Sequence, residues 1–158
     1  MPRSFTVGNG RMLVGLDQKG EVRDFYFPYI GLENHVGRKL RHRVGVFADG
    51  RLSWLESEEW KVSVDCAGET LATSISAENS RLSLELHFTD LVYNERNVFV
   101  RRVEVFNRRN EEREVKFFFH HEFEISESHT GDTAYFSPQD HAVIHYKGRR
   151  VFLITTLT

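Results

Sequence analysis

The sequence predicts an all-β fold, a sandwich of two antiparallel sheets with roughly ten or eleven strands. Apolar residues recur at every second position over most of the 158 residues, and turn-forming residues interrupt them at short intervals. The 13 Phe, 5 Tyr and 2 Trp residues support this prediction, because aromatic side chains favour strands and can fill the space between two sheets. No segment has the periodicity of an amphipathic helix.

Alternation is clearest in three segments, residues 60–66, 81–88 and 114–125. In chain order, the side chains predicted to share a packed face are Trp60, Val62, Val64 and Cys66; then Leu82, Leu84, Leu86 and Phe88; then Val115, Phe117, Phe119, Phe123 and Ile125. Cys66 is accordingly predicted to be a small buried hydrophobe.

Turn signals separate these strands. They fall at residues 17–20, 49–50, 67–69, 78–80, 107–110 and 147–148. The pair Asp49-Gly50 between two apolar runs is a strong hairpin signal. The glycines of the opening VGNGRMLVG precede a strand rather than a helix, so Gly8 and Gly10 are predicted to permit a positive φ or a close backbone approach.

Two segments break the pattern, residues 26–43 and 126–141. Both are predicted to be loops of a length that often carries function. The first contains YFPYIGLENHVG, which crowds aromatic residues, a proline, two glycines and an Asn-His pair into twelve positions. Gly31 and Gly37 are predicted to let the backbone turn sharply there.

Composition excludes several classes of protein. The net charge of -2 and the pI near 6.4 argue against nucleic-acid binding, and the basic clusters at 38–43 and 108–109 are interpreted as solvated surface. No apolar run approaches the ~18 residues of a membrane span, so no membrane association is expected. A single cysteine and no recognisable secretion signal predict a cytoplasmic protein.

The sequence holds no convincing catalytic or metal-binding set. His120 and His121 are adjacent on a predicted strand and would point to opposite faces, and no Cys pair or H-E-x-x-H motif occurs. No metal, cofactor or catalytic residue is therefore predicted. The loop carboxylates are Asp17, Asp24, Glu33 and Asp132. Their spacing does not show that any two face each other across one bond, as glycosidases require.

The stretch GNGRMLVGLDQKGEVRDFYFPYIGLENHVG nevertheless resembles the start of the bacterial and archaeal branch of glycoside hydrolase family 15, the glucoamylase-like enzymes. The matching residues are Gly8-Asn9-Gly10, Asp17 with Gly20, Tyr26-Phe27-Pro28, Gly31 and Asn34-His35. The later HTGDTAYF and HYKGRRVFL are also similar to that family. The resemblance covers most of the chain.

The resemblance implies a β-supersandwich like that of galactose mutarotase, possibly truncated, with residues 1–158 forming one N-terminal domain. In that family a catalytic (α/α)6 barrel follows and performs inverting hydrolysis of α-glucosidic bonds with two glutamates. The barrel is absent from these 158 residues. The chain is therefore expected to be non-catalytic, with the barrel as its partner and an α-glucan or α-glucoside as the substrate of the parent enzyme.

On this interpretation the 26–37 loop meets the barrel or the sugar, and its candidate residues are Tyr29, Glu33, Asn34 and His35. Two alternatives stay open: a free-standing carbohydrate-binding module, and a small mutarotase-like sugar enzyme. A bare barrel-docking face would be a large exposed apolar patch, and it could also make the chain a homodimer.

Overall fold

The computed structural model describes residues 5–36, 39, 41–128 and 130–157, so the predicted turn at Gly37 lies outside the described residues. Thirteen strands and one short 3-10 helix occupy the described part of the chain. The strands are β1 (Phe5–Gly8), β2 (Leu13–Leu16), β3 (Val22–Tyr26), β4 (Arg43–Ala48), β5 (Arg51–Trp54), β6 (Lys61–Cys66), β7 (Thr73–Asn79), β8 (Leu84–Val92), β9 (Phe99–Asn107), β10 (Val115–His120), β11 (Thr133–Ser137), β12 (Ala142–Lys147) and β13 (Arg150–Ile154), and the 3-10 helix η1 is Ile125–Glu127.

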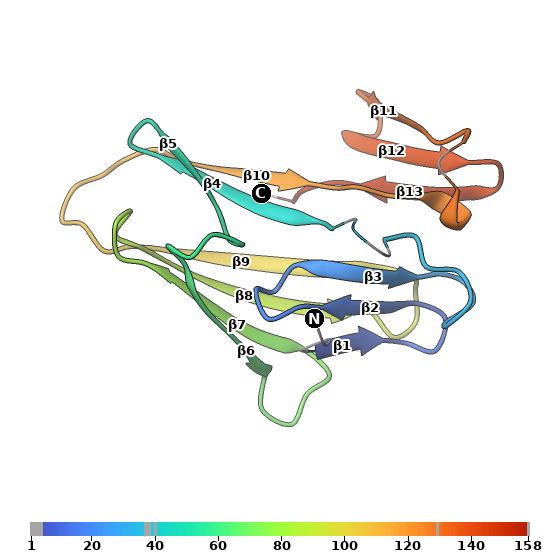
Figure 1. Cartoon of the computed structure of the whole chain (residues 1–158), viewed down its shortest axis with the longest axis horizontal. Helices are drawn as coiled ribbons and strands as arrows, with labels where there is room; N and C mark the ends of the chain where they lie inside the picture. Colours follow the sequence, from blue (N-terminus) through green and yellow to red (C-terminus); the bar gives the residue numbers. More distant parts are fainter. Residues whose placement is uncertain (1–4, 37–38, 40, 129, 158) are drawn as a thin grey trace.

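Every strand pairing is antiparallel, which confirms the predicted fold class. The hydrogen-bonded ladders form four small sheets, in the orders β1-β2-β3, β10-β4-β5, β11-β12-β13 and β6-β7-β8-β9. Figure 1 shows them at two levels, with β4, β5 and β10–β13 above and β1–β3 and β6–β9 below. The buried apolar side chains between these levels make one contiguous core.

The alternation predicted for residues 81–88 is confirmed, since Leu82, Leu84, Leu86 and Phe88 are all buried. Two other burial predictions are wrong. Cys66 is exposed, because it ends β6, the edge strand of its sheet. Phe119 is 39% exposed near the end of β10, which is also an edge strand.

The first predicted loop is confirmed between β3 and β4 as far as its residues are described. The second is partly wrong, because β11 forms within residues 126–141 and pairs with β12. Its side chains are mostly exposed, so burial leaves no alternation in the sequence for a pattern to detect.

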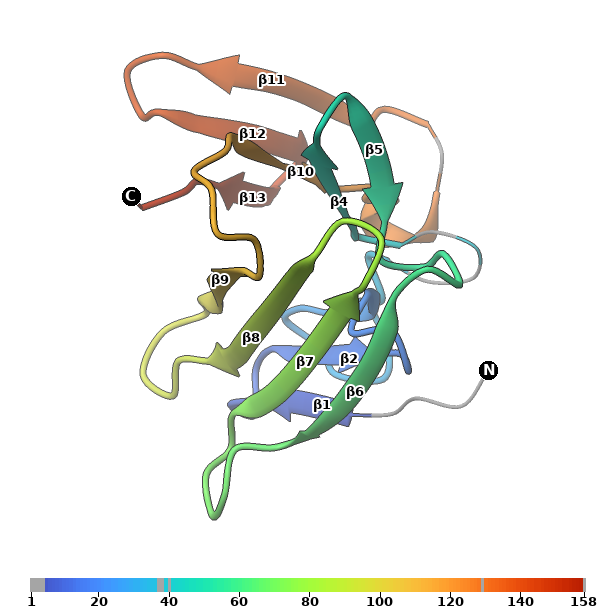
Figure 2. The same cartoon turned by 90° about the vertical axis from the view of Figure 1, so that its left-hand side faces the viewer.

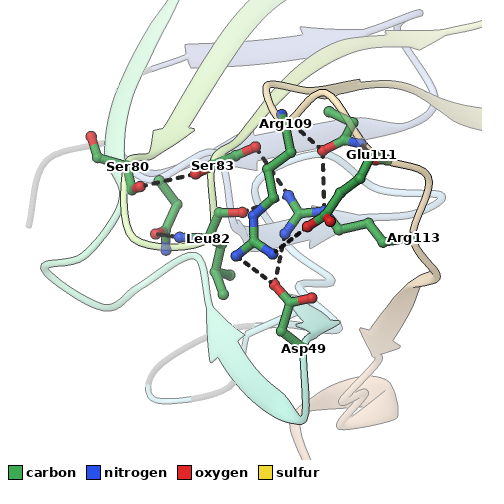
Figure 3. Close-up of polar contacts among 9 residues, drawn as sticks. Asp49, Ser80, Leu82, Ser83, Arg109, Glu111 and Arg113 are labelled. Atoms are coloured by element: carbon green, nitrogen blue, oxygen red, sulfur yellow. Dashed lines mark hydrogen bonds and ion pairs between the residues drawn. The ribbon is translucent and has the colours of Figure 1, made fainter.

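The predicted hairpin joins β4 to β5, and Asp49 and Gly50 both have positive φ values, as a tight turn of this kind requires. Asp49 also forms ion pairs through Oδ2, with Arg109 Nη2 at 2.9 Å and with Arg113 Nη1 at 2.7 Å (Figure 3). Arg113 donates further to the backbone oxygens of Leu82 and Ser83. Arg109 is therefore part of a clamp that joins turns from both levels, and not simply solvated surface as predicted.

A second clamp lies inside the lower level, and this one is buried. Asp90 on β8 is fully buried, and Arg101 on β9 meets it with two nitrogens at 2.8 and 2.6 Å. Arg101 also donates to the backbone oxygen of Gly20, in the turn between β2 and β3. This pair therefore fastens the β1–β3 sheet to the β6–β9 sheet.

Two histidines meet beside the core at the junction of β4 and β10. His42 is buried, and its ring packs 4.5 Å from that of Phe123 and 4.7 Å from that of His121. The two Nδ1 atoms lie 3.3 Å apart, so one ring can donate to the other only while the accepting ring is neutral, and the contact is lost when both rings are protonated. Burial, and to a lesser extent the neighbouring positive charges, lower the pKa of His42 well below its usual value. The pKa of His121 is also lowered, mainly by burial and then by the positive charge of Arg101.

Candidate functional site

In the opening motif, the side chain of Asn9 links the turn between β1 and β2 to the turn between β8 and β9. Asn9 accepts from the N–H groups of Arg11 and Met12 and donates to the backbone oxygens of Tyr93 and Arg96. A Cβ on Gly8 would lie 2.7 Å from the backbone oxygen of Met12, so this position needs glycine. The predicted close backbone approach is confirmed, and its consequence is a fixed turn rather than a phosphate-binding loop.

The loop that follows β3 is anchored first by Asn34. Its Oδ1 accepts from the N–H groups of Phe25 and Val36, and its Nδ2 donates to Asp24 Oδ1 at 2.7 Å. A backbone bridge between Tyr26 and Asn34 brings the two ends of the loop together. The side chain of Asn34 therefore points back at the strand that the loop leaves.

His35 is the second anchor and is fully buried. The N–H of Ser126 donates to Nδ1 at 3.2 Å, so the proton of the neutral ring is on Nε2, which donates to the backbone oxygen of Phe27 at 2.6 Å. Burial lowers the pKa of His35, and the Phe27 carbonyl opposes this only in part. The ring therefore acts as a neutral bridge between the loop and η1.

Glu33 is the third anchor, and its partner is distant in the sequence. Arg150 at the start of β13 donates from Nε to Oε2 at 2.9 Å and from Nη2 to Oε1 at 2.8 Å. Such a two-bonded arginine–carboxylate pair fixes orientation as well as distance. Its hydrogen bonds lower the pKa of Glu33, which keeps that carboxylate ionised. The loop is thereby fastened to the hairpin of β12 and β13.

Between these anchors the loop presents three apolar side chains to solvent. Tyr29, Ile30 and Leu32 are 58%, 39% and 77% exposed. The Phe27-Pro28 peptide bond is cis, and the backbone turns back on itself because the N–H groups of Leu32 and Glu33 both donate to the Tyr29 oxygen. We call Tyr29, Ile30 and Leu32 the apolar tip.

A polar cluster lies behind η1 and holds it in place. Asp132 accepts from the N–H of Ile125, and Lys147 donates to the backbone oxygens of Ile125 and Ser128. His145 approaches Asp132 to 3.4 Å. The side chains of Asp132 and Lys147 are partly buried and bond the backbone of η1 and its flanking residue, so the arrangement supports the turn that contacts His35.

The four carboxylates singled out from the sequence are each engaged in such local bonds. Asp17 accepts from two backbone N–H groups in its own turn, Asp24 accepts from Asn34, Glu33 pairs with Arg150, and Asp132 supports η1. Among residues 5–36, 39, 41–128 and 130–157, no three His, Cys, Asp or Glu side chains are placed to hold a metal ion. Of the residues described, no helix has the length and apolar character of a membrane span.

Of the candidate residues named from the sequence, the structure brings Glu33, Asn34 and His35 together at the base of the loop and leaves Tyr29 at its tip. Sequence reasoning missed Arg150 and Ser126, the long-range partners of Glu33 and His35. Residues 145–153, HYKGRRVFL, contain Arg150 and were singled out only for their resemblance to a family.

Comparison with known proteins gives one informative relative. The chain is 26% identical over 148 residues to an uncharacterized glycosyl hydrolase of Methanocaldococcus jannaschii. The match covers 94% of this chain and 23% of the relative, so the chain spans less than a quarter of the relative's length. No protein-family model matches the chain, and no solved structure matches it. The chain is thus similar to a small part of a glycosyl hydrolase.

Proposed function

We propose that this chain is a non-catalytic β-sandwich domain of a glucoamylase-like, inverting α-glucosidase of glycoside hydrolase family 15, and that it packs on the catalytic (α/α)6 barrel. The observation that carries this proposal is the apolar tip, whose side chains Tyr29, Ile30 and Leu32 face solvent from an anchored loop. The match to less than a quarter of a glycosyl hydrolase supports a partner domain elsewhere in such a protein.

The anchors explain why the tip suits a docking role. A loop that is already held in one conformation loses little conformational freedom when a partner binds, and the affinity is greater for that reason. Asn34, His35 and the pair of Glu33 with Arg150 supply this order. In the proposed complex, Tyr29 and its apolar neighbours contact the barrel near its α-glucan or α-glucoside pocket, and Asn34 and His35 keep the loop in shape. The expected compartment is the cytoplasm.

Removing the matching segment from the M. jannaschii relative tests the proposal. The remaining protein is expressed alone, with its own segment as a separate chain, or with the present chain, and hydrolysis of maltooligosaccharides, dextran and trehalose is measured. We expect the remainder alone to be insoluble or inactive and the added segment to restore activity. Full activity of the soluble remainder alone, or hydrolysis by the present chain alone, would contradict the proposal.

A surface variant tests the tip itself. Tyr29→Ser combined with Leu32→Ser should weaken binding of the present chain to the remainder at least about tenfold, since both side chains lose apolar contact. The matched control is Leu71→Ser, because Leu71 is 84% exposed on a different turn. An equal effect of control and test variants would argue against docking through the tip. Binding of maltooligosaccharides that depends on Tyr29 would instead favour a carbohydrate-binding module.

A further inference from the structure

Strand β9 (Phe99–Asn107) lies at the edge of its sheet. It pairs over its full length of nine residues with β8, and the sheet order β6-β7-β8-β9 leaves its other side without a paired strand among the described residues (Figure 2). A long edge strand exposes a row of backbone N–H and C=O groups that can pair with another chain. Natural proteins usually protect such an edge with charged side chains, a proline or a bulge.

The exposed face of β9 has no proline and carries one charge of each sign, Arg102 and Glu104, which pair with each other at 2.9 Å within the strand, so the face is complementary to itself. Val100, Arg102, Glu104 and Phe106 alternate along this face, and all four are exposed. When two copies of β9 run antiparallel with Val103 opposite Val103, each Arg102 lies opposite the Glu104 of the other copy. Each Val100 then lies opposite a Phe106. The opposite charges of Arg102 and Glu104 attract in this register, whereas a register that placed Arg102 opposite Arg102 would bring like charges together.

The opposite face of β9 is also incompletely covered. Val105 points to the same side as the partly buried Val103, yet it is 43% exposed. In the same register Val105 lies opposite Arg101 of the other copy, and the head of Arg101 is already held by Asp90. The hydrocarbon part of Arg101 is thus the surface that would cover Val105.

From this pattern we propose that the chain forms a two-fold symmetric dimer through antiparallel pairing of β9 with β9. The pairing joins two four-stranded sheets into one continuous sheet, and because the interface is two-fold symmetric every cross-strand contact except that of Val103 with itself occurs twice. Backbone hydrogen bonds supply the attraction, and the contacts of Arg102 with Glu104 and of Val100 with Phe106 set the register.

The mass of the whole chain in solution tests the proposal first. Sedimentation velocity between about 5 and 500 µM should show a concentration-dependent change from 18.5 kDa to twice that mass. Arg102→Glu and Glu104→Arg each place like charges opposite one another twice, and each should raise the dimer dissociation constant by about tenfold or more. The combined swap within one chain restores the opposite charges and should restore the dimer.

An equimolar mixture of the two single variants gives the sharpest test. In a mixed dimer, Arg102→Glu contributes two acidic residues and Glu104→Arg contributes two basic residues, so this pair should associate although neither variant does so alone. The matched control is Lys61→Glu, which makes the same charge change on β6, the opposite edge of the sheet. Monomeric wild-type chain at 500 µM would overturn the proposal. A dimer dissociation constant that neither single charge reversal changes, or a mixture of the two variants that stays monomeric, would overturn the β9 register.

Discussion

Replacing His35 with Phe should destabilise the protein more than any conservative change at an exposed histidine. The ring is fully buried and bridges the Phe27 oxygen at 2.6 Å and the Ser126 N–H at 3.2 Å. Phe fills a similar volume but offers neither bond. A fully buried backbone group left without a partner costs about 1–3 kcal/mol. Both of these bonds are only partly buried, so their joint loss should fall short of the full sum and lower the free energy of unfolding by about 2–5 kcal/mol.

Urea denaturation and thermal melting measure this loss. For a chain of this size the expected loss corresponds to a Tm about 5–15 °C lower. His87→Phe is the matched control, because His87 lies on the outer face of β8 with 43% of its side chain exposed, and it should change stability by less than about 0.5 kcal/mol. A His35→Phe protein within about 0.5 kcal/mol of the wild type would refute the reasoning that His35 anchors the loop.

Three further predictions follow from the other contacts. Asp90→Ala should cost about 3–5 kcal/mol in unfolding free energy, because it leaves Arg101 buried without its carboxylate; urea midpoints measure this, and a loss below about 1 kcal/mol would contradict it. Acid should destabilise the protein through His42 and His121, whose folded pKa values are lowered, to about 4 for His121. The unfolded state then binds more protons, so this contribution is full above about pH 6.5 and is lost as the pH falls toward 4. Unfolding between pH 7.5 and 4.5 should show a smaller loss in His121→Asn, and an unchanged pH profile in that variant would rule out the effect. Native Cys66 should react fully with a thiol reagent before unfolding, because it is exposed; a thiol that reacts only in denaturant would show that it is buried.

Much of the fold was predictable because a strand that buries one face has apolar residues at every second position. Strand β8 buries every second residue along its whole length, and its alternation was detected. The same reasoning failed where a strand borders solvent. Cys66 and Phe119 continue an apolar alternation past the edge of the core, and β11 has four exposed residues of five, so neither alternation nor burial distinguishes it from a loop.

The candidate site was predictable in its location but not in its geometry. The crowding of Asn34 and His35 beside Pro28 marked this loop as special. Which side chains turn inward depends on Ser126 and Arg150, which are 91 and 117 residues away from their partners His35 and Glu33. No local pattern encodes a contact of that separation, so the sequence could not show that Asn34 and His35 support the loop while Tyr29 is its exposed part.

The same separation has a consequence for the order in which the protein is made. A ribosome adds about 5–20 residues per second, so the 117 residues between Glu33 and Arg150 take about 6–23 s to synthesise. During that interval the apolar tip leaves the ribosome without the contacts that later fix it. Contacts between distant residues also form slowly in free refolding. We therefore expect the protein to be most prone to aggregation, and most dependent on chaperones, in the interval when its N-terminal part has been made and Arg150 has not.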